Sequence, residues 1–277
     1  MSTTTATTGA FIEREQIPFS TVFRKQFLNW ERLTQVLVIG VGLVLWEVIG
    51  RRLGTFFLAP PSSLVSATAE MLATGEMVTA FVDSLSSLLV GFALAAVLGL
   101  LFGFLMGWYR KVGTVLNPFV SAAYVIPTAG LVPVIIIWFG LGFTARMLTV
   151  LLFCVFEVLI STYTGVRNVD PLLIDAARSF GANRRQLFTK VVMLASLPYI
   201  FAGLRMGISR AVKGMVIAEL LFAVTGIGGE IQTAANYYRT DKVFVYVILL
   251  ALMGVALAAA VQLIERRVMP WQQERTS

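Results

Sequence analysis

The segment SLSSLLVGFALAAVLGLLFGFLMGW, residues 84–108, contains no charged side chain. An α-helix rises about 1.5 Å per residue, so about 20 apolar residues cross a hydrocarbon core that is about 30 Å thick. The length and composition of residues 84–108 therefore predict one membrane-spanning helix.

Further blocks of the chain have the same apolar character. The predicted spans are residues 33–49, 84–108, 115–139, 147–164, 196–222 and 243–264. The 277-residue chain is 57% hydrophobic and 13% charged, whereas soluble domains carry about 25% charged residues. We therefore expect an all-α membrane protein, with six transmembrane helices in a single bundle over residues 33–264.

Two segments outside the spans have amphipathic patterns. In the N-terminal segment, residues 1–32, the aromatic residues recur every three or four positions: Phe19, Phe23, Phe27 and Trp30. This spacing predicts an interfacial helix that lies along the membrane surface. Between the first two spans, Pro60-Pro61-Ser62-Ser63 predicts the start of a short surface helix capped by serine.

The orientation follows from the basic residues, because cytoplasmic connections are enriched in Lys and Arg. Most of the Lys and Arg residues lie in four segments: the N-terminal segment 1–32, the connection with Arg110 and Lys111, the loop of residues 165–195 and the tail of residues 265–277. Fewer lie in the opposite connections: Arg51, Arg52, Arg146, Arg239 and Lys242. We expect both termini, including the segment 1–32 and the tail, to be cytoplasmic.

The residue content excludes several functions. The chain has no histidine and a single cysteine, Cys154, so it lacks the usual ligands for a metal site and the base of a catalytic triad. It also lacks the Gly-x-x-x-x-Gly-Lys-Ser/Thr loop that binds nucleotide phosphates. Its basic residues form no continuous stripe for nucleic acid. We expect a non-enzyme without cofactor or metal.

The loop of residues 165–195 carries clear helix-capping signals. Asp170 can cap a helix that begins at Pro171, and Gly181 can end it in the left-handed conformation. Asn183 and Gln186 then have the spacing of a capping box. The loop is predicted to form two short helices joined by a sharp turn.

The first of these helices presents an apolar stripe outside the membrane. Its members are Leu173, Ala176, Ala177 and Phe180. Such a stripe suits a groove on another protein, or it packs against the ends of the chain's own spans. The sequence alone leaves both interpretations open.

Several short motifs together resemble a known family. Asp175-Ala176-Ala177, followed by Gly181, resembles the EAA loop of ABC importer permeases. The flanking matches are Ile126-Pro127, Leu131-Val132-Pro133, Trp138 to Gly142, Arg167 to Pro171, Ala218-Glu219, Gly226-Ile227-Gly228 and Glu265-Arg266-Arg267. Over residues 33–271 the chain is similar to the nitrate, taurine and aliphatic sulfonate permease family. It departs from that family at Asp175, which is usually Glu, and at Met193-Leu194, where Leu-Pro is usual.

The resemblance implies a type I ABC importer permease (MetI-like) in a bacterial inner membrane, with a cytoplasmic coupling helix. It implies that two permease copies, as a homodimer, bind two ATPase subunits and receive cargo from a periplasmic or lipid-tethered binding protein. The cargo would be a small anion such as nitrate, taurine or a sulfonate. The residues that would contact the ATPase are Leu173, Asp175, Ala176, Ala177, Phe180 and Gly181.

Three other functions remain compatible with the sequence. One is a secondary transporter of small anions, and another is an ABC permease for an uncharged or cationic vitamin precursor. The third is a structural or assembly membrane protein.

Three cations, Arg205, Arg210 and Lys213, lie inside the fifth predicted span. Each costs about 2.5 to 3.5 kcal/mol near the centre of a bilayer, so they should face protein or a cavity. Helical spacing places them on one side of the span. They either make a translocation path attractive to anions or pair internally with Glu157 and Glu219.

The fifth and third spans contain two further signals. Gly203, Gly207 and Gly214 form a seam that would let another helix approach closely. In the third span, Pro127 and Pro133 each remove a backbone donor and bend or break a helix. The segment from Pro127 to Trp138 either forms part of the pathway or its gate, or is simply kinked.

Overall fold

The computed structural model describes residues 20–222 and 225–270, and these residues contain helices and no strand. The long helices are α1 (Ser20–Leu53), α3 (Glu76–Trp108), α6 (Phe143–Arg167), α9 (Met193–Phe222) and α11 (Thr240–Val268). The shorter helices are α2 (Pro61–Ala73), α4 (Arg110–Val125), α5 (Thr128–Phe139), α7 (Pro171–Ser179), α8 (Arg184–Gln186) and α10 (Gly226–Asn236). Five helices are long and apolar enough to span a membrane, and the pair α4 and α5 can supply a sixth span. The predicted all-α membrane bundle is confirmed.

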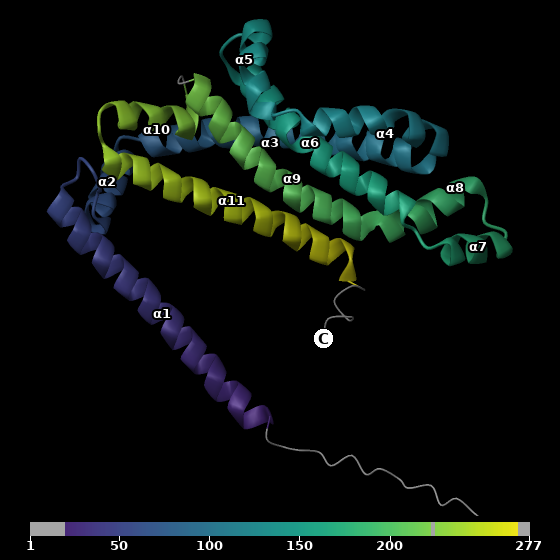
Figure 1. The fold of residues 1–277 in the computed structure, drawn as a ribbon, viewed down its shortest axis with the longest axis horizontal. Helices are drawn as coiled ribbons and strands as arrows, with labels where there is room; N and C mark the ends of the chain where they lie inside the picture. Colours follow the sequence, from purple (N-terminus) through teal and green to yellow (C-terminus); the bar gives the residue numbers. More distant parts are fainter. Residues whose placement is uncertain (1–19, 223–224, 271–277) are drawn as a thin grey trace, which may run out of the picture.

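Helix α6 is the centre of the bundle, and α1 is its least packed member. Half of the most apolar window of α6 (50%) is buried within the chain, against 6% for the corresponding window of α1. Figure 1 shows α1 running away from the other long helices, with α7 and α10 at opposite ends of the bundle. These ends are called the α7 end and the α10 end below.

A row of small residues lets α3 pack closely on α6. The row is Gly91, Ala95, Gly99, Gly103 and Gly107, all buried. A β-carbon at Gly99 would lie 2.7 Å from the Cβ atom of Val158, which is closer than any stable contact. The small-residue spacing of four therefore sets the distance between the two helices.

The glycine seam predicted on the fifth span is confirmed, and it faces α6. A β-carbon at Gly203 would lie 2.6 Å from the Cβ atom of Ser161, and one at Gly214 would lie 2.6 Å from Phe153. Helix α6 is thus held between glycine faces of α3 and α9.

The third span, expected as residues 115–139, consists of two helices. Helices α4 and α5 meet at an angle of 92°, with Ile126 in an extended conformation immediately before Pro127. A residue before proline is disfavoured in the helical region, and proline has no N–H group to donate. Pro133 lies within α5 without ending it, so only Pro127 breaks the span.

The second short helix predicted in the loop is not separate from the fifth span. Helix α8 continues through a π-helical turn, Leu187–Val192, into α9. The apolar helix therefore extends over Arg184–Leu221. The sharp turn predicted between the two short helices is present, between Ser179 and Arg184.

The cap of α2 differs from the prediction. Pro60 occupies the N-cap position without a side-chain hydrogen bond. Instead, Glu47 of α1 accepts hydrogen bonds from the Ser62 backbone N–H at 3.0 Å and from the Ser62 hydroxyl at 2.8 Å. A carboxylate is favourable at a helix N-terminus, so a residue of another helix takes the role expected of serine.

The predicted N-terminal interfacial helix is only partly described. Residues 20–53 form one continuous helix, so a separate helix does not precede the first span within the described residues. Residues 1–19 and the tail residues 271–277 lie outside the described part. The interfacial location therefore stays a prediction.

Ion pairs join α2, α3 and α11 at the α10 end. Lys242 contacts Glu76 at 2.8 Å, and Arg239 contacts Glu70 at 3.2 Å. Helix α10 was not expected from the sequence. Its Glu230 has a pKa above the ordinary value, first because the carboxyl is partly buried and then because the charge of Glu76 is nearby. The two ion pairs hold the start of α11 against α2 and α3.

Candidate functional site

The cations predicted in the fifth span line an open hollow of about 460 Å³ along α9. Its lining residues are Ala202, Arg205, Met206, Ser209, Arg210 and Lys213. The exposed members lie about one helical turn apart, Arg205 with Met206, then Ser209 with Arg210, then Lys213, and form a stripe along α9 beside the face that packs on α6. The lining contains three cations and no acidic residue.

Arg210 is paired at one edge of the hollow. Its guanidinium lies 2.9 Å from a carboxylate oxygen of Glu157 on α6. The Tyr124 hydroxyl of α4 donates to the same carboxylate at 3.0 Å, and Arg210 donates to the Tyr124 oxygen at 3.4 Å. Glu157 is buried while Arg210 is about half exposed, so internal pairing with Glu157 is observed and Arg210 still reaches the hollow.

The other two cations of the hollow differ in their partners. Arg205 contacts Glu265 of α11 at 3.2 Å, near the α7 end. Lys213 is exposed, and it forms no ion pair within residues 20–222 and 225–270. Lys213 is therefore the cation most available to a solute in the hollow.

Glu219, the second predicted partner of these cations, lies elsewhere in a buried polar cluster. Its carboxylate accepts hydrogen bonds from the Ser84 hydroxyl at 2.8 Å and from the Gly228 N–H at 2.9 Å. Its cation is Arg146, at 3.4 Å. The Ser84 hydroxyl in turn accepts from the Ile227 N–H at 2.8 Å. This cluster joins α3, α6, α9 and the start of α10.

The sequence predicts that Arg146 lies in a connection, and this prediction is wrong. It lies within the first turn of α6, and its residue is only 6% exposed. A second carboxylate, Asp83 of α3, lies 3.6 Å from it. A buried arginine needs paired carboxylates, but residues 83, 146 and 219 are too far apart in sequence for their pairing to be read from it.

The predicted pathway residues of α5 do not line the hollow. Pro127, Pro133 and Trp138 are all exposed, and the lining of the hollow comes entirely from α9. Helix α5 packs instead through Val132 and Ile135. A role for the three exposed residues in the pathway stays a prediction.

Helix α7 begins and ends as its sequence predicts. The Asp170 carboxylate accepts a hydrogen bond of 2.9 Å from the Leu172 N–H, and Pro171 follows Asp170 in the first helical position. At the other end, Gly181 has φ +80°. The Ala182 N–H donates to the Ala177 carbonyl at 3.0 Å, as in a Schellman motif.

Most of the apolar stripe of α7 is unpacked. Leu173 is exposed, and Phe180 is 92% exposed. The neighbouring Leu172 is 75% exposed. Ile174 lies outside the predicted stripe, and it packs against the cluster of Val166, Val169 and Val192. Ile174 therefore attaches α7 to the bundle, and the rest of its apolar surface is open.

The polar residues of the loop make local contacts. Asp175 pairs with Arg178 on its own helix at 3.5 Å, and both side chains are exposed. The Asn183 and Gln186 capping box is present, with both hydrogen bonds at 2.9 Å. The described residues contain no group of His, Cys, Asp and Glu that could hold a metal ion.

Comparisons with known proteins give a consistent result. Residues 95–270 match the family model described as "Binding-protein-dependent transport system inner membrane component". The chain is 32% identical to a probable ABC transporter permease protein of Brucella abortus (strain 2308), with 86% of this chain and 95% of the relative covered. It is 31% identical to a putative aliphatic sulfonates transport permease protein of Bacillus subtilis (strain 168), with 86% and 87% covered.

Two further similarities extend this result. A formylaminopyrimidine transport permease protein of Halalkalibacterium halodurans is 28% identical, with 89% of this chain and 99% of the relative covered. Among solved structures, an inward-facing methionine ABC transporter superposes with a TM-score of 0.58 at 19% identity, over 69% of this chain and 95% of that chain. The structural similarity supports the fold of a type I importer permease.

Proposed function

Because this chain belongs to the family of binding-protein-dependent transport system inner membrane components, we propose that it moves a small anionic solute along the cationic side of α9. The family fixes the coarser function: the chain is the permease subunit of an ABC importer, a multi-pass inner-membrane protein and not an enzyme. A separate ATPase and a substrate-binding protein are its partners in that family. The secondary-transporter and assembly-protein alternatives are thereby set aside.

The hollow on α9 carries the proposal about the cargo. Three cations and the hydroxyl of Ser209 line it, with no acid among the lining residues. Lys213 has no ion pair in the described part of the chain, and a lysine in a span is costly unless it faces water or a ligand. An anion that enters the hollow would meet Lys213 first and could share Arg210 with Glu157.

The named relatives support an anionic cargo but do not identify which anion it is. The Bacillus relative is named for aliphatic sulfonates, which are anions, whereas the Halalkalibacterium relative is named for formylaminopyrimidine. A sulfonate group offers several oxygen acceptors to the ammonium and guanidinium donors of the hollow. We therefore favour a sulfonate-like or carboxylate-like cargo over an uncharged or cationic vitamin precursor.

The exposed face of α7 supports a coupling role. We infer that the α7 end faces the cytoplasm, with both termini, and that Leu172, Leu173 and Phe180 enter a groove on the ATPase. An amphipathic helix in an apolar groove is a common recognition mode. The Ile174 contact with Val166, Val169 and Val192 would transmit movement of α7 to the spans α6 and α9.

The open side of the hollow supports a second permease copy. A path through the membrane needs a wall opposite α9, and no helix of the described chain lines the hollow from that side. The weak packing of α1 leaves further surface for a partner. We infer a homodimer with two ATPases. Oxidative cross-linking of Met206→Cys in a Cys154→Ala background should give a dimer, and a protein that remains monomeric under oxidation contradicts this assembly.

The cargo class is tested by competition. Cells that express the permease with its ATPase and binding protein are given a labelled alkanesulfonate, and unlabelled solutes of each charge class compete. We expect uptake of the label, with competition by small anions such as sulfonates or nitrate. If the labelled alkanesulfonate is not taken up, while a labelled uncharged or cationic solute is taken up and no anion competes with it, the anionic cargo is excluded and the ABC assignment stays intact.

A further inference from the structure

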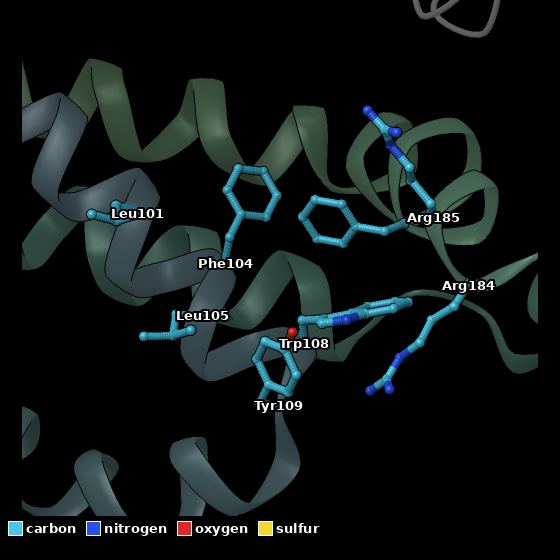
Figure 2. Close-up of a pocket in the computed structure, with 8 residues that line it drawn as sticks. Leu101, Phe104, Leu105, Trp108, Tyr109, Arg184 and Arg185 are labelled. Carbon is cyan, nitrogen blue, oxygen red and sulfur yellow. The ribbon is translucent and has the colours of Figure 1, made fainter.

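A second pocket lies at the α7 end of the bundle, between α3 and the start of the helix that contains α8. Its volume is about 490 Å³, and its lining residues are Leu101, Phe104, Leu105, Trp108, Tyr109, Arg184, Arg185 and Phe188. Figure 2 shows the leucines and Phe104 along α3, with Arg184 and Arg185 at the other end of the pocket, where their side chains point in opposite directions. The pocket is therefore apolar at one end and cationic at the other.

Aromatic contacts hold the middle of this pocket. The Phe188 ring lies edge-on to Phe104, with centroids 5.6 Å apart, and edge-on to Trp108 at 5.0 Å. The guanidinium of Arg184 lies 5.9 Å from the centroid of the Trp108 ring and 5.7 Å from that of Tyr109. These distances are within the range of cation–π attraction, so the rings position Arg184 at the end of the α3 span.

The charge of the two arginines is not neutralised within the chain. Arg184 and Arg185 are both exposed, and neither forms an ion pair in residues 20–222 and 225–270. No acidic residue lines the pocket. The cationic end therefore suits an anionic group from outside the described chain.

The apolar end identifies the kind of ligand. Leu101 and Leu105 are 57% and 38% exposed on a helix that is apolar enough to cross the membrane, so this end of the pocket faces the acyl chains of the bilayer. Trp108 and Tyr109 lie where the span ends, as aromatic residues do at the membrane interface. A soluble partner protein could reach the arginines but not the leucines.

We propose that this pocket binds one anionic phospholipid. An acyl chain lies along Leu101 and Leu105, and the phosphate accepts hydrogen bonds from Arg184, with Arg185 adding positive charge. Basic pockets between spans are suited to lipid head groups, and arginines near a membrane surface attract anionic lipids. The site is separate from the α9 hollow and does not depend on the identity of the cargo.

Native mass spectrometry of the full-length permease in detergent tests the site. Phosphatidylglycerol and phosphatidylcholine with identical acyl chains are titrated against the wild-type protein and the double variant Arg184→Gln/Arg185→Gln. We expect the wild type to prefer phosphatidylglycerol, and the double variant to bind it about tenfold or more weakly. The affinity for phosphatidylcholine should change little.

A second arginine pair provides the matched control. Arg266 and Arg267 are exposed in the last turn of α11, so Arg266→Gln/Arg267→Gln removes the same charge away from the pocket. This variant should bind phosphatidylglycerol as the wild type does. The proposal is overturned by equal losses in the two double variants, by unchanged binding in the first, or by equal wild-type affinity for both lipids. It is also overturned if bound ATPase displaces the phosphatidylglycerol, since the pocket would then be a protein interface.

Discussion

Arg210 of α9 and Glu157 of α6 form an ion pair of 2.9 Å at the edge of a cationic hollow. The pair connects the central helix of the bundle to the helix that carries the hollow. It also distinguishes two cations that the sequence alone does not distinguish. Arg210 forms an ion pair with a buried acid, while Lys213 has no ion pair in the described residues.

The first prediction concerns this pair. Arg210→Glu should lower the stability of the folded protein, because it places a second carboxylate beside the buried Glu157. Breaking a buried pair costs about 3 to 5 kcal/mol, and the loss here should be smaller because Arg210 is about half exposed. The measurement is the melting temperature of the purified protein in detergent. The exchange Glu157→Arg/Arg210→Glu should recover much of the lost stability, and an exchange that is as unstable as the single variant argues against the pair.

The second prediction concerns the close packing of α3 on α6. Gly99→Ala should destabilise the protein by about 1 to 3 kcal/mol, the usual range for overpacking, because its β-carbon would lie 2.7 Å from Val158. Gly254→Ala on α11 is the control, since no atom lies within 4 Å of its β-carbon and alanine is the better helix former. Thermal melting of both variants tests this difference in stability. Equal melting temperatures would show that α3 and α6 are not in close contact at Gly99.

The third prediction concerns the coupling helix. Gly181→Val should abolish ATPase association, because φ is +80° at this position and a β-branched residue strongly disfavours that conformation. Space is not the obstacle, since nothing lies within 4 Å of a β-carbon there. Asp175→Lys should weaken the same association by changing the charge of the exposed α7 surface. Co-purification of the ATPase with tagged permease measures both effects.

Gly54 provides a matched control for that experiment. It has φ +81° and the same open surroundings, but it lies at the opposite end of the bundle, between α1 and α2. Gly54→Val should carry the same backbone strain and still bind the ATPase. If Gly181→Val and Asp175→Lys both retain full ATPase binding, α7 is not the coupling element.

The fourth prediction concerns topology. In a Cys154→Ala background, a cysteine at Ser179 on α7 should react with membrane-impermeant maleimide only after the cells are opened. A cysteine at Tyr237, which is 76% exposed at the α10 end, should react in intact cells. The distribution of Lys and Arg residues supports this orientation. Labelling of position 179 from outside intact cells would reverse it.

The sequence predicts the parts of this fold that depend on local signals. Apolar length marks the spans, and Asp170, Gly181 and Asn183 mark the ends of the loop helices because each acts on the backbone within a few residues of itself. Gly203 and Gly214 could be predicted to face a helix, but which helix they face could not.

Contacts between distant residues could not be predicted in this way. The cluster of Ser84, Arg146 and Glu219 joins three spans, and no periodicity relates these positions. Pro127 predicts a break but not an angle of 92°. The continuation of α8 into α9 was missed because the polar residues Arg184 and Arg185 resemble a loop, although here they lie at the end of a long helix.

The last prediction addresses the cationic hollow through the charge of Lys213. Uptake of the anion identified by competition is measured for Lys213→Arg, Lys213→Gln and Lys213→Glu, at equal amounts of permease in the membrane. Lys111→Glu, an exposed lysine outside the hollow, is the control. The account predicts that Lys213→Arg and Lys111→Glu transport as the wild type does. It predicts that Lys213→Gln loses about tenfold in rate, the effect of roughly 1.4 kcal/mol, and that Lys213→Glu loses more. Wild-type uptake by Lys213→Glu would contradict an anion path along α9.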